Sequence, residues 1–325
     1  MSGFWKGKTC LVTGATGFLG GSLVAELLRE GAEVIALVRD MVPQSRFAAT
    51  DLAGRAKVVR GALEDYAVIE RALNEYAVDT VFHLGAQAIV GVANRNPLST
   101  FEANIKGTWV LLEACRRVST VERIVVASSD KAYGDHATLP YQEDFALQGR
   151  HPYDVSKSCA DLIALSYAQT WRLPVSITRC GNLFGPGDLN VNRIVPGTCL
   201  AAIDGERPVI RSDGSPVRDY VYVEDIVQAY LRLAEHMDDE GVVGRAFNFG
   251  TGDPVSVLDL TRRTLAAAGR PDLEPDVRNN AHGEIQAQYL SSALALDKLG
   301  WRPGAGLDER LKQTFLWYRA NRHVF

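Results

Sequence analysis

The 325-residue sequence lacks the features that mark secreted, membrane-embedded and disulfide-stabilised proteins. Its five cysteines are odd in number and form no CxxC pair, which argues against both a disulfide framework and a zinc site. No apolar run is long enough to span a membrane, and the few residues before the first predicted strand leave no room for a secretory signal. We therefore expect a cytoplasmic protein with no metal site and no contact with a membrane.

Lysine and arginine do not cluster anywhere in the sequence. The formal net charge is -4 and the sequence pI is about 5.9, so the positive surface that binds nucleic acid is missing. In contrast, 46% of the residues are hydrophobic, which is enough for a large core in a chain of this length. The composition thus indicates a globular protein whose ligands are small molecules.

The first half of the chain alternates short β-rich apolar runs with longer amphipathic segments. This alternation is typical of βαβ units, because each helix crosses over from one parallel strand to the next. The predicted strands cover 9–13, 33–38, 57–60, 80–84, 123–127 and 175–179, and the predicted helices cover 18–29, 66–76, 97–118 and 152–171. The fold class is therefore α/β, with a doubly wound parallel sheet.

The second half has a different texture. Glycine and proline crowd the stretch 181–197, which predicts loops, where ligand contacts concentrate. Helices are predicted over 223–235, 256–268 and 308–319, and a strand over 245–249. Because no flexible linker is evident, we assign 1–180, with parts of about 220–250, to one domain. The rest of 181–325 then forms a smaller, interleaved α/β substrate lobe.

A glycine-rich turn joins the first predicted strand to the first predicted helix. Glycines at this place allow a tight turn and a close approach of the backbone, while the helix N-terminus offers N–H groups and a positive dipole end to a pyrophosphate. The run is Gly14-Ala15-Thr16-Gly17-Phe18-Leu19-Gly20. It predicts a Rossmann domain that binds a dinucleotide, NAD or NADP, through Gly14, Thr16, Gly17, Phe18, Leu19 and Gly20.

The end of the second strand bears on the choice between NAD and NADP. An acid there would hold the adenosine ribose of NAD, but this position is Val38, followed by Arg39 and Asp40. Arg39 is suited to the 2′-phosphate of NADP, whereas Asp40 can reach a ribose if the strand is longer. Alternatively, both charges form a solvated loop pair. The choice stays open, with NADP slightly favoured.

Tyr153 and Lys157 lie four residues apart at the start of a predicted helix, hence on one face of it. A lysine so placed can lower the pKa of the phenol and hydrogen-bond the nicotinamide ribose, which makes Tyr153 a base. Ser129 follows the strand predicted over 123–127 and would donate a hydrogen bond to the oxygen that changes oxidation state. This set predicts a hydride-transfer site.

Together, the glycine run, the Ser129, Tyr153 and Lys157 set and the RDYVYVED segment at 218–225 resemble the extended short-chain dehydrogenases/reductases over nearly the whole chain. In that family, nucleotide-sugar 4,6-dehydratases carry an acid and a second ionisable group after the Ser or Thr, and here these are Asp130 and Lys131. The Ser-Asp-Lys-x-Tyr string, the EIQAQYL segment at 284–290 and the LGW segment at 299–301 are similar to CDP-glucose 4,6-dehydratases.

The resemblance implies a redox-neutral reaction on an NDP-hexose, first of all CDP-glucose, with a tightly bound, recycled NAD(P). Transient oxidation at C4 acidifies C5, water is eliminated across C5 and C6, and hydride returns to C6. We assign Lys131 to the C5 proton and Asp130 to the departing C6 oxygen. Alternatively, these two residues form a salt bridge that caps a loop. A 4-epimerase or 4-reductase would need only Ser129, Tyr153 and Lys157, and a dinucleotide-sensing protein would need none of them.

The remaining expectations concern ligand contacts and assembly. The family often has an acid after the third strand to bind adenine, but Ala62 stands here, so we expect the backbone around Leu63, together with Leu84, to contact the cofactor. We expect Asn182, Arg193 and Arg218 to bind the substrate, since guanidinium groups fork onto diphosphate oxygens. The segment 215–220 differs from the CDP-glucose enzymes, so the base stays open. The family's pairing of the helices predicted over 97–118 and 152–171 suggests a homodimer.

Overall fold

The computed structural model describes residues 3–280 and 285–325. Its centre is a seven-stranded sheet in the order β11-β6-β5-β4-β1-β2-β3, in which every neighbouring pair is parallel. The strands are β1 (Thr9–Thr13), β2 (Glu33–Val38), β3 (Lys57–Arg60), β4 (Thr80–His83), β5 (Arg123–Ala127), β6 (Val175–Cys180) and β11 (Ala246–Phe249). The predicted doubly wound sheet is confirmed, and its order reverses between β1 and β4, where such sheets bind ligands.

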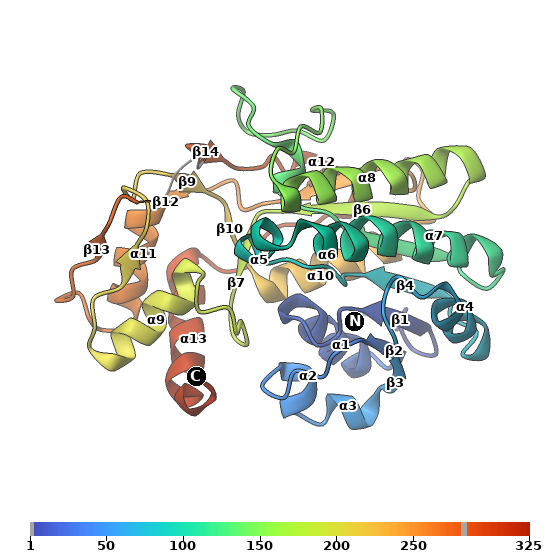
Figure 1. Cartoon of the computed structure of the whole chain (residues 1–325), viewed down its shortest axis with the longest axis horizontal. Helices are drawn as coiled ribbons and strands as arrows, with labels where there is room; N and C mark the ends of the chain where they lie inside the picture. Colours follow the sequence, from blue (N-terminus) through green and yellow to red (C-terminus); the bar gives the residue numbers. More distant parts are fainter. Residues whose placement is uncertain (1–2, 281–284) are drawn as a thin grey trace.

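Helices cover both faces of this sheet (Figure 1). Side chains alternate along each strand, so Val12 and Phe82 face one layer, whereas Leu11 and Val81 face the other. The first layer holds α1 (Phe18–Arg29), α2 (Arg46–Ala49), α3 (Leu52–Arg55), α10 (Val223–Glu235) and α12 (Ala293–Leu299). The second holds α4 (Tyr66–Glu75), α7 (Gly107–Arg117) and α8 (Pro152–Trp171).

The helix predicted over 97–118 is divided into three pieces. They are α6 (Pro97–Phe101), a π-helical turn (Glu102–Lys106) and α7. In the π-helical turn Asn104 is buried, and its amide donates to the Gln87 carbonyl at 3.1 Å and to Ser156 Oγ at 2.9 Å. Such turns often occur at functional sites, and this one ties the segment after β4 to α8. The short helix α5 (Val90–Arg95) precedes it.

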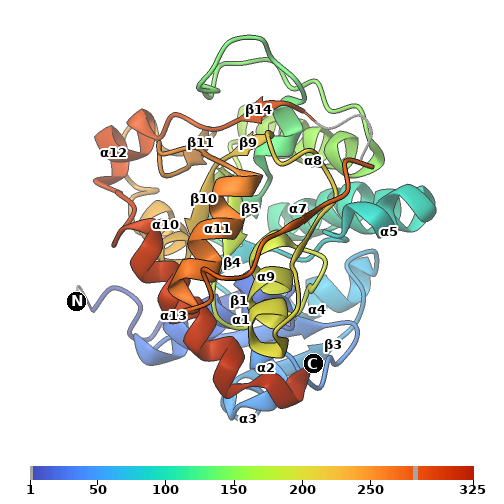
Figure 2. The same cartoon turned by 90° about the vertical axis from the view of Figure 1, so that its left-hand side faces the viewer.

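The second lobe packs three helices around its own apolar cluster (Figure 2). These are α9 (Ile194–Asp204), α11 (Val257–Ala267) and α13 (Leu307–Ala320). Three small sheets accompany them and contain β7 (Asn182–Phe184), β8 (Val209–Ile210), β9 (Val217–Arg218), β10 (Tyr220–Tyr222), β12 (Val255–Ser256), β13 (Asp276–Val277) and β14 (Ala287–Gln288). Strand β10 pairs with β7 and leads into α10, so the chain passes back from the lobe to the main sheet.

The start of α9 differs from the loop expected over 181–197. Pro196 and Gly197 lie in its first turn, where a proline is tolerated because the first N–H groups of a helix have no intrahelical partner. Gly197 N–H donates to the Arg193 carbonyl at 3.0 Å, so Arg193 is the cap of this helix. Composition alone did not predict this helix, whose N-cap is the predicted substrate residue Arg193.

Two further expectations from the sequence concern membrane spans and the EIQAQYL segment. No helix among the described residues is long and apolar enough to cross a membrane. Glu284, the first residue of the EIQAQYL segment, lies outside the described residues.

Candidate active site

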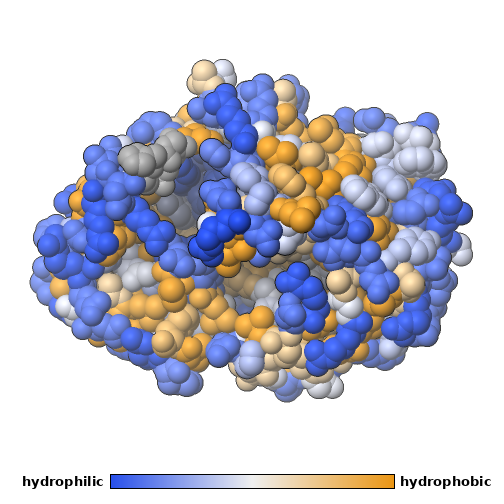
Figure 3. All heavy atoms as spheres, viewed as in Figure 1, coloured by the Kyte–Doolittle hydropathy of each residue, from blue (hydrophilic) through white to orange (hydrophobic). Residues whose placement is uncertain are grey.

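A cleft of about 1610 Å³ opens at the carboxyl ends of the sheet strands, between the main sheet and the second lobe. Figure 3 shows a hollow in the surface at this place. It is lined by every residue predicted to bind cofactor or substrate or to take part in catalysis: Gly14, Thr16, Gly17, Phe18, Leu19, Gly20, Arg39, Asp40, Leu63, Leu84, Ser129, Asp130, Lys131, Tyr153, Lys157, Asn182, Arg193 and Arg218. Residues from both halves of the chain thus meet in one site.

The turn between β1 and α1 leaves no room for side chains at two of its glycines. Gly14 has a φ of +73°, and a Cβ there would lie 2.8 Å from the Gly85 nitrogen. A Cβ on Gly20 would lie 2.1 Å from the Gly14 carbonyl oxygen. No described side chain caps the N-terminus of α1 at Gly17, so its first N–H groups face the cleft. This cradle fits a pyrophosphate.

The end of β2 carries two exposed charges. Arg39 Nε donates to Asp40 Oδ2 at 2.6 Å, and the side chains are 64% and 69% exposed. The solvated loop pair considered from the sequence is therefore present. Strand β2 ends at Val38, so it is not longer than expected. Both residues still line the cleft, as does Leu63 from the far edge of the sheet.

Ser129, Tyr153 and Lys157 converge where β5 ends. Ser129 caps the 3-10 turn η2 (Asp130–Tyr133), and its Oγ accepts from the Lys131 backbone N–H at 3.2 Å. A hydrogen bond joins its hydroxyl to Tyr153. Lys157, one helical turn beyond Tyr153, donates to the Ala127 carbonyl at 2.8 Å. The predicted set is thus brought together from β5, η2 and α8.

Burial controls the acid–base properties of this set. It raises the pKa of Tyr153 to about 12, although the hydrogen bond with Ser129 opposes the rise. Burial also lowers the pKa of Lys157 to about 8. Loss of hydration outweighs the nearby groups that lower the pKa of the phenol, and the effect of Lys157 on Tyr153 stays a prediction.

Asp130 and Lys131 form an ion pair at the cleft. Asp130 is 2% exposed, and Lys131 Nζ lies 3.1 Å from its Oδ2. Ser129 Oγ donates to the other oxygen of the same carboxylate at 3.0 Å. The salt bridge considered as an alternative is thus real, but it lies in the wall of the cleft beside Tyr153 rather than on a remote loop.

Gln288 belongs to the EIQAQYL segment, but sequence reasoning assigned it no role. This fully buried residue of β14 accepts a hydrogen bond from Lys131 Nζ through its Oε1. Its Nε2 donates to the Asp130 carbonyl at 3.0 Å and to the Gly134 carbonyl at 3.4 Å. Only the tertiary structure reveals the contact, because more than 150 residues separate the partners along the chain.

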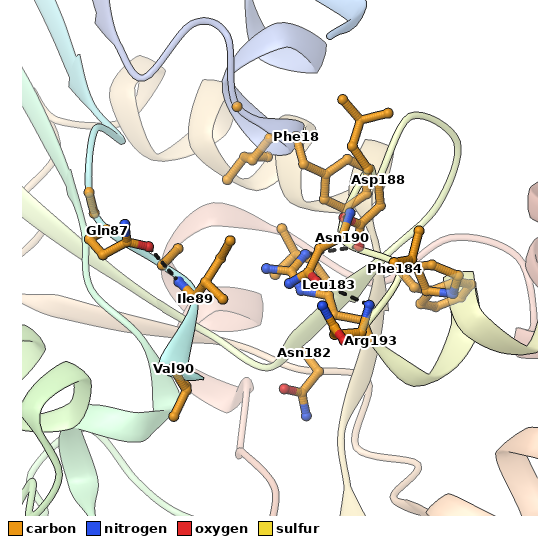
Figure 4. Close-up of a pocket in the computed structure, with 18 of the residues that line it drawn as sticks. Phe18, Gln87, Ile89, Val90, Asn182, Leu183, Phe184, Asp188, Asn190 and Arg193 are labelled. Atoms are coloured by element: carbon orange, nitrogen blue, oxygen red, sulfur yellow. Dashed lines mark hydrogen bonds and ion pairs between the residues drawn. The ribbon is translucent and has the colours of Figure 1, made fainter. Parts of the chain in front are cut away.

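The predicted substrate residues lie on the second-lobe side of the cleft. Figure 4 shows Asn182 and Arg193 across the cavity from Ile89 and Val90. Arg193 donates to Oδ2 of the buried Asp188 at 2.9 Å, which fixes its guanidinium. Asp188, in turn, accepts through its backbone carbonyl from Tyr318 of α13 at 2.6 Å. The Asp188 support was not predicted, since its only sequence signal is its place after the GPG turn.

Arg218 lies on β9 and lines the same wall. Its guanidinium donates to the Val217 carbonyl at 2.8 Å. Three further arginines that sequence reasoning missed, Arg207, Arg211 and Arg278, line this part of the cleft. The concentration of guanidinium groups favours an anionic ligand at the second-lobe end.

His83 is buried behind the phosphate-binding turn. Its ring nitrogens lie 2.9 Å from Thr13 Oγ1 and 3.0 Å from Thr108 Oγ1. Burial lowers the pKa of its imidazole to about 3, so it is neutral at physiological pH. Its contacts are those of a structural histidine. Among the described residues, no group of three or more His, Cys, Asp or Glu is placed to hold a metal ion.

The model of the NAD dependent epimerase/dehydratase family matches residues 10–250, which include the glycine turn, the catalytic set and Arg218. The chain belongs to this family. The resemblance to extended short-chain dehydrogenases/reductases is thereby confirmed.

Curated relatives include three kinds of nucleotide-sugar dehydratase. The dTDP-glucose 4,6-dehydratase of Streptomyces antibioticus is 32% identical over 96% of this chain and 92% of its own length. The CDP-glucose 4,6-dehydratase of Salmonella typhimurium is 29% identical over 98% and 92%. A trifunctional UDP-glucose 4,6-dehydratase of Arabidopsis thaliana, with epimerase and reductase activities in its name, is 29% identical over 98% of this chain. The chain spans about half, 48%, of that relative's length.

Solved structures give the same fold. The UDP-glucose 4-epimerase of Thermotoga maritima, in complex with UDP-glucose, superposes with a TM-score of 0.87 at 29% identity over 97% of this chain and 99% of its own. The dTDP-glucose 4,6-dehydratase DesIV of Streptomyces venezuelae, with NAD and TYD bound, gives 0.86 at 28% identity over 97% and 98%. Both an epimerase and a dehydratase therefore share this architecture.

Proposed function

We propose that the protein is a nucleotide-sugar 4,6-dehydratase, a lyase that converts an NDP-hexose to its 4-keto-6-deoxy form. The observation that carries the proposal is the Asp130–Lys131 pair in the wall of the cleft, next to Ser129 and Tyr153. An epimerase needs no such pair, whereas elimination of water needs one group for the C5 proton and one for the C6 oxygen. The dehydratase relatives support the same conclusion.

In this proposal each of four residues has one role in the proton transfers of the reaction. Tyr153 takes the proton of the C4 hydroxyl, while Ser129 turns its single O–H from Asp130 to that oxygen. For this step the pair reacts as a neutral amine and a carboxylic acid, the form reached when one proton passes from Lys131 to Asp130. Lys131 removes the C5 proton, exchanges it with solvent and later gives a proton back to C5, and Asp130 gives a proton to the departing C6 oxygen, which leaves as water. NAD held at the glycine turn would supply reversible hydride transfer and a positive charge in the cleft.

The proton balance of this scheme agrees with the hydrogen bonds around Ser129. Each turnover leaves one extra proton on Tyr153 and one too few on Asp130. Ser129 is joined to both, by its hydrogen bond with Tyr153 and by the 3.0 Å bond that it donates to Asp130. A proton shift along these two bonds would restore the starting state without a solvent proton, and it requires that the bound ligands lower the pKa of Tyr153 from its raised value in the free protein.

We propose NAD as the cofactor, in place of the slight preference for NADP drawn from the sequence. Arg39 is paired with Asp40 and exposed rather than held ready for a 2′-phosphate. The family is NAD dependent, and the DesIV structure contains NAD. The glycine cradle and the first turn of α1 would hold the pyrophosphate, and Leu63 and Leu84 would line the rest of the cofactor site.

The diphosphate of the substrate lies, in this proposal, among Asn182, Arg193 and Arg218. Arginine forks match phosphate oxygens, and Arg193 is fixed by Asp188. The relatives act on CDP-, dTDP- and UDP-sugars according to their names, so the first choice of CDP-glucose rests on the sequence motifs alone.

A 4-epimerase is the second candidate. The observation that favours it is the ion pair itself, since Asp130 and Lys131 satisfy each other and are then free of any chemical role. The similarity to the Thermotoga maritima epimerase has the same weight as the similarity to DesIV.

Incubation of the protein with NAD and CDP-, dTDP-, UDP- or GDP-hexoses in heavy water separates the candidates. A product lighter by one water, with deuterium at C5, establishes the dehydratase and identifies its nucleotide. An unchanged mass with inverted C4 would establish the epimerase. No turnover of any donor would favour the reductase or the dinucleotide-sensing protein.

Substitutions at the pair then test the roles. Asp130→Asn and Lys131→Met should each slow water loss by about 100-fold or more while C4 oxidation continues, since general acid–base catalysis contributes about 100- to 10000-fold. Asp135→Asn is the matched control, because this exposed acid lies just beyond the same turn. Equal loss of both steps in Lys131→Met would contradict the assignment.

We also propose a homodimer through α7 and α8. Large apolar side chains are exposed on this side of the molecule, where Figure 3 shows a patch over α6 and α8. They include Leu98 (70% exposed), Trp109 and Leu162. Burying such a face against a second copy is the usual closed arrangement. Leu162→Glu should convert the dimer to monomer in gel filtration at micromolar concentration, and a monomeric unmodified protein would contradict the proposal.

A further inference from the structure

We propose that Gln288 is a positioning residue that orients the amine of Lys131 for its part in water elimination. The inference rests on the proposed dehydratase function and assigns a role to a residue outside the cleft. Gln288 is buried and does not line the cavity, so it acts on the substrate only through Lys131 and the turn that carries it.

The first step of the argument concerns the hydrogen-bonding capacity of a lysine amine. A neutral amine has two N–H groups and one lone pair, and only the lone pair can accept a proton. Lys131 Nζ has two acceptors in the structure, Asp130 Oδ2 and Gln288 Oε1. Both N–H groups of a neutral Lys131 are then occupied, which directs the lone pair away from the two acceptors. Since Lys131 lines the cleft, this lone pair is then available to a substrate bound there.

The second step concerns the other end of the same amide. Gln288 Nε2 donates to the carbonyls of Asp130 and Gly134 at 3.0 and 3.4 Å, one at the start of η2 and one just after it. The amide therefore fixes the turn and the lysine amine together. A side chain with acceptors alone cannot make both sets of bonds, because the carbonyls of the turn need a donor and the lysine amine needs an acceptor.

The third step concerns what holds Gln288 in place. Strand β14 pairs in parallel with β9, with Gln288 opposite Arg218. On its other side the Tyr289 carbonyl accepts from Tyr141 N–H at 2.9 Å, and Ser291 N–H donates to the Tyr141 carbonyl at 2.9 Å. The segment is anchored on both sides, so the position of the amide is set by β9 of the second lobe and by the Tyr141 segment of the first domain. Gln288 thus links the wall that holds Arg218 to the elimination residues.

The test uses the protein with NAD and the donor that it turns over. Gln288→Met keeps the length of the side chain and removes both polar contacts. Water loss should slow about 10- to 100-fold, because small errors in the position of a reacting group cost about that much. C4 oxidation and KM should change less than about threefold, so reduced nicotinamide accumulates on mixing. Gln286→Met, two residues away with an exposed side chain, is the matched control.

A double-substitution cycle separates positioning from support of the fold. If Gln288 acts through Lys131, Gln288→Met should slow water loss less than about twofold in a Lys131→Met background. An undiminished effect there, or an equal loss of oxidation and elimination in the single variant, would overturn the proposal.

Gln288→Glu gives an independent readout if the methionine variant folds poorly. It keeps an acceptor for Lys131 and adds a negative charge to a site where Lys131 already faces Asp130 on its own turn and Asp154 on α8. Glutamate also loses the amide donor to the carbonyls of Asp130 and Gly134, so water loss should slow about 10- to 100-fold while C4 oxidation changes less than about threefold. Unchanged water loss, or an equal loss of both steps, would overturn the proposal. Absence of water loss in the unmodified protein would instead overturn the dehydratase function and this assignment with it.

Discussion

The two ends of the cleft are built in different ways. At the proposed cofactor end, seven consecutive residues form the cradle from backbone atoms: two of its glycines leave no room for a Cβ, and no described side chain caps the first N–H groups of α1. At the proposed substrate end, Asn182, Arg193 and Arg218 come from separate segments and line the cleft with their side chains. The catalytic set lies between them.

This difference has a physical consequence for substitution. A backbone site tolerates changes of exposed side chains but no added volume at its glycines. A side-chain site tolerates substitutions at neighbouring positions of the chain. It depends instead on each charged group and on the residue that holds this group in place, as Asp188 holds Arg193. Five substitutions sharpen this comparison, beginning at the centre of the cleft with the largest effect and ending with the smallest.

Tyr153→Phe removes the base shared by both ends of the cleft. The C4 oxidation rate should fall about 1000-fold, since general base catalysis contributes about 100- to 10000-fold. Stopped-flow absorbance of the reduced nicotinamide measures it. Tyr66→Phe is the matched control, because that phenol bonds to Glu70 on the surface of α4. A loss below about tenfold in Tyr153→Phe would rule out Tyr153 as the base.

Lys157 makes stability depend on pH. Burial lowers its pKa from 10.5 to about 8, so the unfolded chain binds more protons than the folded one between these values. Stability therefore rises with pH through this window and is lost again as pH falls through about 8. Relative to Lys157→Met, the free energy of unfolding should gain about 2 kcal/mol between about pH 7 and pH 9.5. Urea unfolding of both proteins measures the difference, and a pH-independent difference would contradict it.

Gly20→Ala tests the backbone cradle. Because the added Cβ would meet the Gly14 carbonyl oxygen at 2.1 Å, the turn must open and lose its phosphate contacts. The affinity for NAD should fall about 100-fold, or about 2.7 kcal/mol, measured by calorimetry. Gly54→Ala is the matched control and should leave NAD affinity unchanged, because a Cβ on this α3 residue would meet no atom within 4 Å. Unaltered affinity in Gly20→Ala would show that the cradle does not hold the cofactor.

Arg193→Met tests the side-chain end. Loss of a charged hydrogen bond to the diphosphate should raise KM about tenfold and leave kcat within about threefold. Steady-state kinetics measures both, with the exposed Arg262→Met as control. A fall in kcat at constant KM would instead place Arg193 in the chemical step.

Arg39→Met should have the smallest effect. The Arg39–Asp40 pair is exposed, and such pairs contribute about 0–1 kcal/mol. The affinities for NAD and for NADP should each change less than about threefold in a binding titration. A tenfold loss for NADP alone would restore the NADP interpretation of the sequence.

Local patterns predicted much of the fold. The strands at 9–13, 33–38, 57–60 and 123–127 and the helices at 18–29, 152–171 and 223–235 match the structure, since β-rich runs and helical periodicity are short-range properties. The helix α9 was missed because its first turn contains proline and glycine, which composition alone assigns to a loop. The π-helical turn within 97–118 was missed because no local signal distinguishes it from an α-helix.

The candidate site was predicted unevenly for the same reason. Motifs with fixed spacing gave the glycine turn and the Ser129, Tyr153 and Lys157 set, all of which line the cleft. The supports of those residues were not predicted. Asp188 fixes Arg193, and Gln288 bonds to Lys131, through contacts that no spacing rule anticipates.

By itself, the sequence determined the parallel sheet, the phosphate-binding turn and the identities of the reacting groups, because each depends on residues close together in the chain. The tertiary structure alone decided which groups meet. It set the burial that raises the pKa of Tyr153 and lowers that of Lys157, and it paired Asp130 with Lys131 under the amide of Gln288. Desolvation and contacts between distant segments exist only once the two lobes have closed around the cleft, so no local pattern encodes them.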